Sequence, residues 1–247
     1  MRVAILGAGV GRRLNLDDTP PKVLLRFGER SLLERHLRIL TALGVTRIDL
    51  AVGYRAEQVE AEIARLGAEH LVTTHFNPDF ERGAIVSLHR LAPVFTSGDP
   101  VLFMDGDVLY DQRLLAGLAD GRGSAFLMDR TTEEGDDPVK LCFAGDTLVD
   151  FHKRPKVAHD WWGEWIGFAR FASDEAAAIA AAAARYVKGG RLDEIYEEAI
   201  RDVVLERPHG TFGVRDVTGL PWVEIDFPED LARARDEILP KLLPLPK

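Results

Sequence analysis

The chain has 247 residues, of which 46% are hydrophobic and 29% are charged, the usual balance of a globular protein. A net charge of −9 argues against a nucleic-acid coat, although a small anion can still bind in a local basic pocket. The single cysteine, Cys142, excludes an intrachain disulfide. Neither a signal-peptide pattern nor an apolar run of membrane-spanning length is present. We therefore expect a cytoplasmic protein that binds no membrane and no nucleic acid.

The N-terminal half alternates predicted strands with predicted helices. Ser31 and Glu34 have the spacing of a capping box, and the amphipathic pattern that follows ends at Leu43, just before Gly44. In chain order we expect a strand at 3–6, a helix to 43, a strand at 47–52, a helix at 56–66, a strand at 72–75, a helix at 84–91 and a strand at 101–104. This alternation predicts a mostly parallel sheet with helices on both faces.

The second half has a different pattern, with short strand-like runs and few helices between them. Strands are expected at 139–143, 147–151, 165–171, 212–217 and 222–225, and helices at 174–186, 192–205 and 228–239. These runs predict an antiparallel extension of the sheet. Neither a linker nor a repeat is visible, so we expect residues 1–247 to form one domain.

Three glycines alternate just after the first predicted strand, within Leu6-Gly7-Ala8-Gly9-Val10-Gly11. A strand, a glycine loop and a helix place backbone N–H groups where they can bind a phosphate. The loop matches neither the dinucleotide fingerprint nor the Walker loop, because Arg12 and Arg13 stand where those motifs need other residues. A turn without a ligand is the alternative. Arg13 and Lys22 count against it, since guanidinium and ammonium groups are phosphate partners.

Two acidic residues follow strands whose carboxyl ends are expected at one edge of the sheet. Asp107 comes after the strand at 101–104, and Asp226 comes after the strand at 222–225. Transfer of a nucleotidyl group brings several anionic phosphates together, and Mg²⁺ bound by carboxylates neutralises that charge. Asp226 could instead cap the helix that begins near Pro228.

Residues 6–14, followed by Pro21-Lys22-Val23-Leu24, resemble the signature loop of the nucleotidyltransferases. This superfamily includes sugar-1-phosphate nucleotidylyltransferases, molybdenum-cofactor guanylyltransferases and small phosphoalcohol cytidylyltransferases. Residues 104–107 and 222–231 resemble its two metal-binding segments, so the resemblance extends from residue 2 to about residue 235. It implies an α/β fold of the nucleotide-diphospho-sugar transferase type, with a Rossmann-like, mostly parallel mixed sheet flanked by helices.

The resemblance also implies roles for individual residues. Asp107 and Asp226 would hold Mg²⁺, and Asp105 would lie beside the nucleotide. Residues 77–88 resemble the cytidylyltransferase segment that ends in Ser-Leu, which places Ser87 beside the base. The residues expected to bind the nucleotide are Leu6, Gly7, Ala8, Gly9, Gly11, Arg13, Lys22, Ser87 and Asp105.

The acceptor site is expected around Lys153, which resembles the second lysine of the family and would bind the acceptor phosphate; a solvated loop position is the alternative. Three of the four tryptophans lie within residues 160–165. They could be core or a dimer contact, but tryptophan faces also attract ammonium groups. The residues expected to bind the acceptor are Asp129, Lys153, Trp161, Trp162 and Glu164.

The sequence therefore predicts a Mg²⁺-dependent nucleotidyltransferase, with Arg13, Lys22 and Lys153 as its catalytic residues. The expected substrates are an NTP, with CTP favoured, and a small phosphorylated alcohol or phosphonate such as phosphocholine or 2-aminoethylphosphonate. A sugar-1-phosphate nucleotidylyltransferase is the nearest alternative. A regulatory domain that binds nucleotide without turnover is another, although the joint presence of Arg13, Lys22, Asp107 and Asp226 counts against it. The histidines are not expected to act as bases, because a phosphate nucleophile is already ionised.

Overall fold

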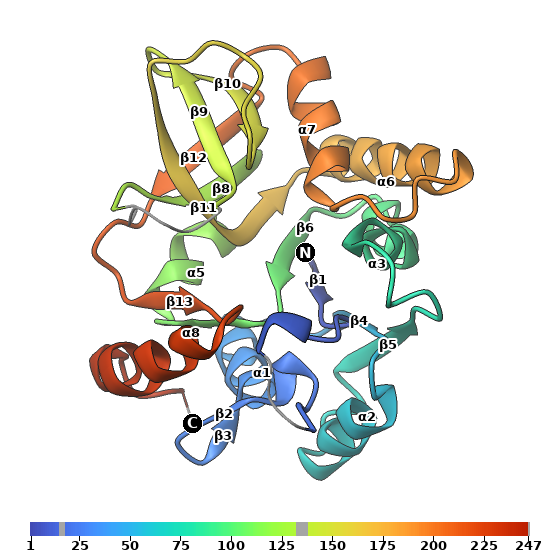
Figure 1. Cartoon of the computed structure of the whole chain (residues 1–247), viewed down its shortest axis with the longest axis vertical. Helices are drawn as coiled ribbons and strands as arrows, with labels where there is room; N and C mark the ends of the chain where they lie inside the picture. The colour runs from blue at the N-terminus through green and yellow to red at the C-terminus, as the bar shows by residue number, and fades with distance from the viewer. Residues whose placement is uncertain (15–17, 132–137, 247) are drawn as a thin grey trace.

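The computed structural model describes residues 1–14, 18–131 and 138–246 (Figure 1). Its main sheet begins with a parallel half in which β1 lies between β6 and β4, and β5 follows β4. The strands of this half are β1 (Arg2–Leu6), β4 (Ile48–Val52), β5 (Val72–Phe76) and β6 (Val101–Asp105). All four strands were expected, β1, β4 and β6 from their apolar runs and β5 from a weaker pattern, and their parallel pairing confirms the α/β prediction.

The antiparallel half of the sheet is organised by one long strand, β11 (Trp161–Phe171). The first part of β11 pairs with β9, and its last part pairs with β6. The remaining strands are β8 (Ser124–Asp129), β9 (Lys140–Ala144), β10 (Thr147–His152) and β12 (Phe212–Asp216), of which β12 pairs with β8 in parallel. This arrangement confirms the mixed sheet with an antiparallel extension.

Helices cover both faces of the sheet (Figure 1). They are α1 (Leu32–Ala42), α2 (Ala56–Arg65), α3 (Ala84–Arg90), α4 (Ala92–Phe95), α5 (Arg113–Ala119), α6 (Ser173–Lys188), α7 (Glu197–Glu206) and α8 (Pro228–Arg233). Ala4 packs in one hydrophobic core with α3, α6 and α7, whereas Val3 and Ile5 pack in a second core with α1 and α2. Successive side chains of a strand point to opposite faces, so a continuous apolar run is what a strand covered on both sides requires. None of the helices among the described residues is both long and apolar enough to cross a membrane.

Short elements around the main sheet complete the fold. β7 (Val108–Tyr110) pairs antiparallel with β13 (Trp222–Glu224), and β2 (Arg26–Phe27) pairs with β3 (Arg30–Ser31). After α8 the chain continues as a π turn (Ala234–Ile238) and a 3₁₀ turn (Leu239–Lys241). A third, smaller core beneath these elements contains Leu14, Phe27, Val223, Ile225 and Leu231.

Two predicted boundaries were wrong for identifiable reasons. β11 begins four residues before the predicted 165, because its first residues pair with β9. α7 begins at Glu197 rather than at 192, because the chain before it bonds to the start of α3 instead of forming a helical turn. There the Gly83 N–H donates to the carbonyl of Leu192, and the Ile85 N–H donates to that of Glu194. β2, α4, β7, α5 and β8 lie outside the predicted elements.

A buried carboxylate, Asp150, ties the end of β10 to α7 and to the loop that contains Lys153. Asp150 accepts hydrogen bonds from Arg201 Nε at 2.7 Å and from the backbone N–H groups of Lys156 and Val157 at 2.8 and 3.1 Å. Burial by itself would raise the pKa of Asp150, but Arg201 and the backbone donors hold it below its ordinary value.

We expect Asp150→Ala to lower the free energy of unfolding by about 3–5 kcal/mol, because it leaves Arg201 without its buried partner. Since the pKa of Asp150 is lowered in the folded chain, its contribution is present above the unfolded value of about 3.9 and is lost as the pH falls through the folded value. Urea unfolding at neutral and acidic pH measures both effects. Asp193→Ala, which breaks an exposed pair with Arg82, is the control and should have a much smaller effect, because solvent screens exposed ion pairs. Equal losses in the two variants would contradict the prediction.

Candidate functional site

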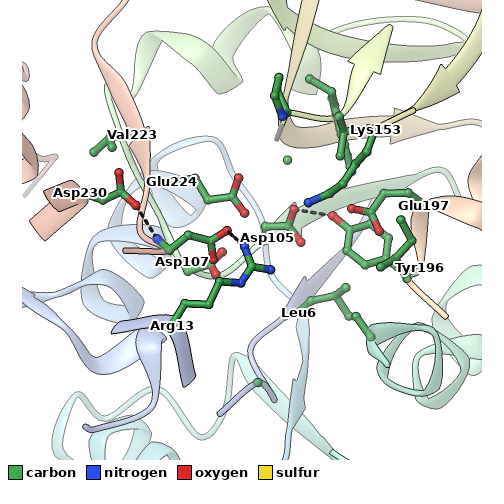
Figure 2. Close-up of a pocket in the computed structure, with 18 of the residues that line it drawn as sticks. Leu6, Arg13, Asp105, Asp107, Lys153, Tyr196, Glu197, Val223, Glu224 and Asp230 are labelled. Atoms are coloured by element: carbon green, nitrogen blue, oxygen red, sulfur yellow. Dashed lines mark hydrogen bonds and ion pairs between the residues drawn. The ribbon is translucent and has the colours of Figure 1, made fainter. Parts of the chain in front are cut away.

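A cavity of about 360 Å³ opens at the carboxyl ends of the strands (Figure 2). Leu6, Asp105, Asp129 and Glu224 all line it, and each is the last residue of its strand, namely β1, β6, β8 and β13. Open α/β sheets bind ligands at this edge, because the loops that follow the strands converge there. Strands from both halves of the sheet therefore contribute to one site.

Three carboxylates gather on one side of the cavity. Asp107, Glu224 and Asp226 each offer an oxygen, and these oxygens lie within 4.8 Å of one another. The pairing of β7 with β13 brings them together, since the Ile225 N–H donates to the Asp107 carbonyl at 3.1 Å. The backbone N–H of Asp226 in turn donates to Asp230 Oδ2 at 2.8 Å. A set of three oxygen donors fits a hard divalent cation such as Mg²⁺.

The basic residues of the glycine-loop region meet these carboxylates directly. Lys22 Nζ lies 2.8 Å from Asp107 Oδ2 and 2.6 Å from Asp226 Oδ1. Burial by itself would lower the pKa of Lys22, but the two carboxylates raise it above its ordinary value, so the ammonium stays charged. Arg13 Nη1 lies 3.0 Å from Asp226 Oδ2, and its side chain is more than half exposed. An ammonium between Asp107 and Asp226 shows that this position favours a cation.

The floor of the cavity is acidic and buried (Figure 2). The Tyr196 hydroxyl donates to Asp105 Oδ2 at 2.5 Å. Burial, with Asp107 nearby, raises the pKa of Asp105 well above its usual range and that of Glu224 to about 8. Burial also raises the pKa of Glu197 to about 7. A cation that enters the cavity lowers the pKa of these carboxyl groups. They then ionise, and their negative charge stabilises the cation.

Gly167 lies directly against Asp105 at an irregularity in β11. Its φ is +82°, and a Cβ at this position would lie 2.7 Å from Asp105 Oδ2. The pairing of β11 with β8 shifts register between Trp165 and Ala169, on either side of this glycine. The bend lets β11 pass from β9 to β6 while leaving room for the Asp105 carboxyl group.

We expect Gly167→Ala to lower the free energy of unfolding by about 1–3 kcal/mol through its backbone conformation alone, with a further loss from contact with Asp105. Gly145→Ala is the matched control, because Gly145 also has a positive φ, +57°, but no atom lies within 4 Å of the added Cβ. Denaturant titration of both variants separates the two contributions. Equal losses would show that contact with Asp105 contributes nothing.

The predicted loop residues divide into two groups. Leu6, Ala8 and Gly9 line the cavity together with Arg13 and Ser87. Gly7 instead packs inward: its N–H donates to the Ala51 carbonyl at 3.0 Å, and an added Cβ would lie 2.9 Å from Val23. Gly11 has a φ of +66°, which glycine adopts readily. Gly7 and Gly11 thus shape the loop, whereas Leu6, Ala8 and Gly9 face the cavity.

Three of the five residues predicted to bind the acceptor line the cavity, and two do not. Asp129, Lys153 and Glu164 line the cavity. Trp161 does not line the cavity. Its ring stacks on Phe143 with the ring centroids 4.1 Å apart, and the guanidinium of Arg130 lies over the ring. Trp162 lies under Lys140, with Nζ 5.0 Å from the ring centroid, and is likewise absent from the lining.

Two other tryptophans, Trp165 and Trp222, line the cavity in their place. The Trp222 indole N–H donates to Asp129 Oδ2 at 2.8 Å, which ties β13 to the end of β8. Glu224, Tyr196 and Glu197 are lining residues that the sequence analysis did not select. Glu224 had a local signal, because it stands two residues before Asp226, and alternate residues of an extended segment point the same way. Tyr196 and Glu197 had none, because only the docking of α7 brings them to the site.

Residues 3–159 match the family described as the MobA-like NTP transferase domain. This match extends over more than half of the chain, and the chain belongs to that family.

Individual relatives add to this assignment. A Thermococcus kodakarensis protein named bifunctional IPC transferase and DIPP synthase is 30% identical over 239 residues, which are 95% of this chain and 50% of that protein. A Debaryomyces hansenii mannose-1-phosphate guanyltransferase is 34% identical over 114 residues, which are 45% of this chain and 32% of the relative. The chain thus spans half or less of the length of these curated relatives.

Solved structures confirm the nucleotidyltransferase fold. The inositol-1-phosphate CTP transferase from T. maritima aligns with a TM-score of 0.75 at 20% identity, covering 97% of this chain and 95% of that one. The CTP:phosphocholine cytidylyltransferase from Streptococcus pneumoniae aligns with the same TM-score, 0.75, and the same identity, 20%, covering 95% of this chain and 97% of that one.

Proposed function

We propose that this chain transfers a nucleotidyl group from an NTP to the phosphate or phosphonate of a small acceptor, with release of pyrophosphate, and that residues 1–247 act as one domain. One observation carries the proposal: Asp107, Asp226, Arg13 and part of the glycine loop line one cavity, and Lys22 contacts both of these carboxylates. Nucleotidyl transfer needs a triphosphate site and a cation site next to each other, and the basic and acidic residues of this cavity are consistent with both.

In the proposed reaction an oxygen of the acceptor phosphate bonds to the α-phosphorus, and the bond from the α-phosphorus to the bridging oxygen breaks as pyrophosphate leaves. Arg13 and Lys22 bind the triphosphate and stabilise the negative charge that develops on it. Lys153 binds the acceptor phosphate. Asp107 and Asp226, with Glu224, would hold Mg²⁺, which supplies neutralisation of phosphate charge. A general base is not required, because the nucleophile is already ionised.

The acceptor that we propose is a phosphorylated or phosphonate aminoalcohol, and the nucleotide is CTP. Asp129, Glu164 and Glu197 line the same cavity as Lys153, together with the aromatic Trp165 and Trp222. Carboxylates and tryptophan faces both attract an ammonium group. Two structural neighbours, an inositol-1-phosphate CTP transferase and a CTP:phosphocholine cytidylyltransferase, are consistent with this choice. The guanyltransferase relative supports a second candidate, in which a sugar 1-phosphate is the acceptor.

A screen of pyrophosphate release tests the proposal. Each of the four common NTPs is combined with phosphocholine, 2-aminoethylphosphonate, inositol phosphate, glycerol phosphate and sugar 1-phosphates. We expect the highest kcat/KM with CTP and a cationic acceptor, because the acidic lining favours a positive charge. A clear preference for a neutral polyol or sugar phosphate would contradict the acceptor class alone. Absence of turnover with every pair would contradict nucleotidyl transfer.

A further inference from the structure

The turn between β6 and β7 is bonded to three different elements in succession. The Gly106 N–H donates to the Leu6 carbonyl at 2.9 Å, at the end of β1. The Asp107 carbonyl accepts from the Ile225 N–H at 3.1 Å, directly after β13. Between these two bonds, the Gly106 carbonyl lies 3.0 Å from Nε2 of His36, in α1. Of the three bonds, only this middle one comes from a side chain.

His36 is a fully buried imidazole whose protonation follows from its surroundings. A carbonyl oxygen can only accept, so Nε2 carries the proton and donates it to Gly106. Burial lowers the pKa of His36 to about 4, so the ring is neutral and Nδ1 carries no proton. The ring of Tyr110, in β7, stacks on His36 with the ring centroids 5.5 Å apart. The imidazole is therefore fixed between α1 and the turn.

The other ring nitrogen of His36, Nδ1, has no hydrogen-bond partner among the described residues. A buried acceptor without a partner costs free energy, and a leucine of similar volume would avoid that cost. An apolar side chain could not supply the bond from Nε2 to the Gly106 carbonyl. The use of an imidazole at this position therefore lies in its bond to the turn.

The bond to Gly106 restricts the direction of the Asp107 side chain. A peptide group is planar, so the Gly106 carbonyl and the Asp107 N–H rotate as one unit. Fixing that carbonyl restricts ψ of Gly106 and φ of Asp107, and these angles determine where the Asp107 side chain points. The Asp107 carboxylate belongs to the cluster with Glu224 and Asp226. A ligand group that is already held in place loses less freedom when a cation binds, so it binds the cation more tightly.

We propose that His36 is a positioning residue for the cation site, where its Nε2–H group holds the peptide group between Gly106 and Asp107 so that the Asp107 carboxylate faces Glu224 and Asp226. The inference rests on the proposed cation site and deepens it. His36 is fully buried and is not one of the residues that line the cavity, so it acts through Asp107 rather than on a substrate.

Three substitutions of His36 test this inference: His36→Gln, His36→Asn and His36→Leu. The amide nitrogen of glutamine can reach the place of Nε2, whereas that of asparagine reaches only the place of Nδ1. We expect His36→Asn and His36→Leu to raise the dissociation constant for Mn²⁺ roughly tenfold, because each loses one buried hydrogen bond. His36→Gln keeps the donor and should stay within about threefold of the wild type.

Mn²⁺ serves as the probe because it takes the same oxygen ligands as Mg²⁺, and its binding is followed by loss of the free-ion signal in electron paramagnetic resonance. Leu40→Ala is the matched control. Leu40 is fully buried one turn further along the same face of α1 and packs in the second core. It should lower the melting temperature at least as much as His36→Leu does, but it should leave the dissociation constant for Mn²⁺ unchanged.

Three results would each overturn the inference: wild-type Mn²⁺ binding in His36→Leu, equal losses in His36→Gln and His36→Leu, or an equal loss in Leu40→Ala. Melting temperatures show whether each variant is folded. If His36→Leu is not folded, the comparison of His36→Gln with His36→Asn decides the question.

The same titration of Asp107→Asn separates this inference from the proposed reaction. If Asp107→Asn binds Mn²⁺ as the wild type does, Asp107 is not a cation ligand and the inference is overturned, while the screen of pyrophosphate release still judges nucleotidyl transfer. If the wild type binds Mn²⁺ through Asp107 but transfers no nucleotide, the proposed reaction fails, and the role of His36 is judged by the ratio of dissociation constants.

Discussion

Asp107→Asn and Asp226→Asn are each expected to lower kcat by at least roughly 100- to 1,000-fold while leaving the fold intact. Asparagine keeps the size of the side chain and removes the negative charge that a divalent cation requires. Both carboxylates are only partly buried, and both already contact Lys22, so the neutral amide can remain solvated or accept from the ammonium. The loss should therefore appear in turnover rather than in stability.

The measurement is pyrophosphate release as a function of Mg²⁺ concentration, together with the melting temperature. Asp216→Asn is the matched control, because Asp216 is an exposed carboxylate paired with Arg130 outside the cavity. It should leave both turnover and the Mg²⁺ dependence unchanged. Near wild-type turnover of Asp107→Asn or Asp226→Asn at saturating Mg²⁺ would remove that residue from the metal site.

Lys22→Met is expected to produce the second large effect, a loss of about 100-fold in kcat with a smaller change in KM for the nucleotide. An ammonium that follows the charge developing on the triphosphate stabilises the transition state more than the ground state. Methionine fills a similar volume without the charge. Removing the ammonium also takes away the cation between Asp107 and Asp226, so the variant should bind Mg²⁺ more tightly than the wild type does.

Steady-state kinetics and a Mg²⁺ titration followed by thermal shift test both parts of this prediction. Arg13→Ala is the comparison, because Arg13 is more than half exposed and contacts only the outer side of the cluster through Asp226. We expect it to raise KM for the nucleotide more than it lowers kcat. If both variants kept the wild-type kcat and KM, the glycine loop would not be the triphosphate site.

Much of the parallel half of the fold was predictable because its signals are local. The apolar runs that became β1, β4 and β6 are buried on both faces, and such runs are visible without any knowledge of their neighbours. Ser31 caps α1 as its spacing predicts, since its side chain accepts from the Glu34 N–H at 3.1 Å. These elements depend on the chain within a few residues of themselves.

The antiparallel half was less predictable, because long-range pairing determines its elements. The first residues of β11 have polar and aromatic neighbours that do not alternate clearly, and they are a strand because β9 lies beside them. The start of α7 is delayed because the preceding residues bond to α3, which is more than 100 positions away in sequence. A contact of this kind leaves no local pattern in either segment.

For the site, the sequence by itself was enough to select the residues that we propose carry the chemistry: the glycine loop, Arg13 and Lys22 after it, and the acids Asp107 and Asp226 after two strands. Only the tertiary structure decided which further groups join them. The pairing of β7 with β13 adds Glu224, and the docking of α7 adds Tyr196 and Glu197. It also decided that Trp165 and Trp222, rather than Trp161 and Trp162, line the cavity, because Trp161 and Trp162 lie in the part of β11 that pairs with β9, whereas Trp165 lies beside the end of β8 and Trp222 lies in β13.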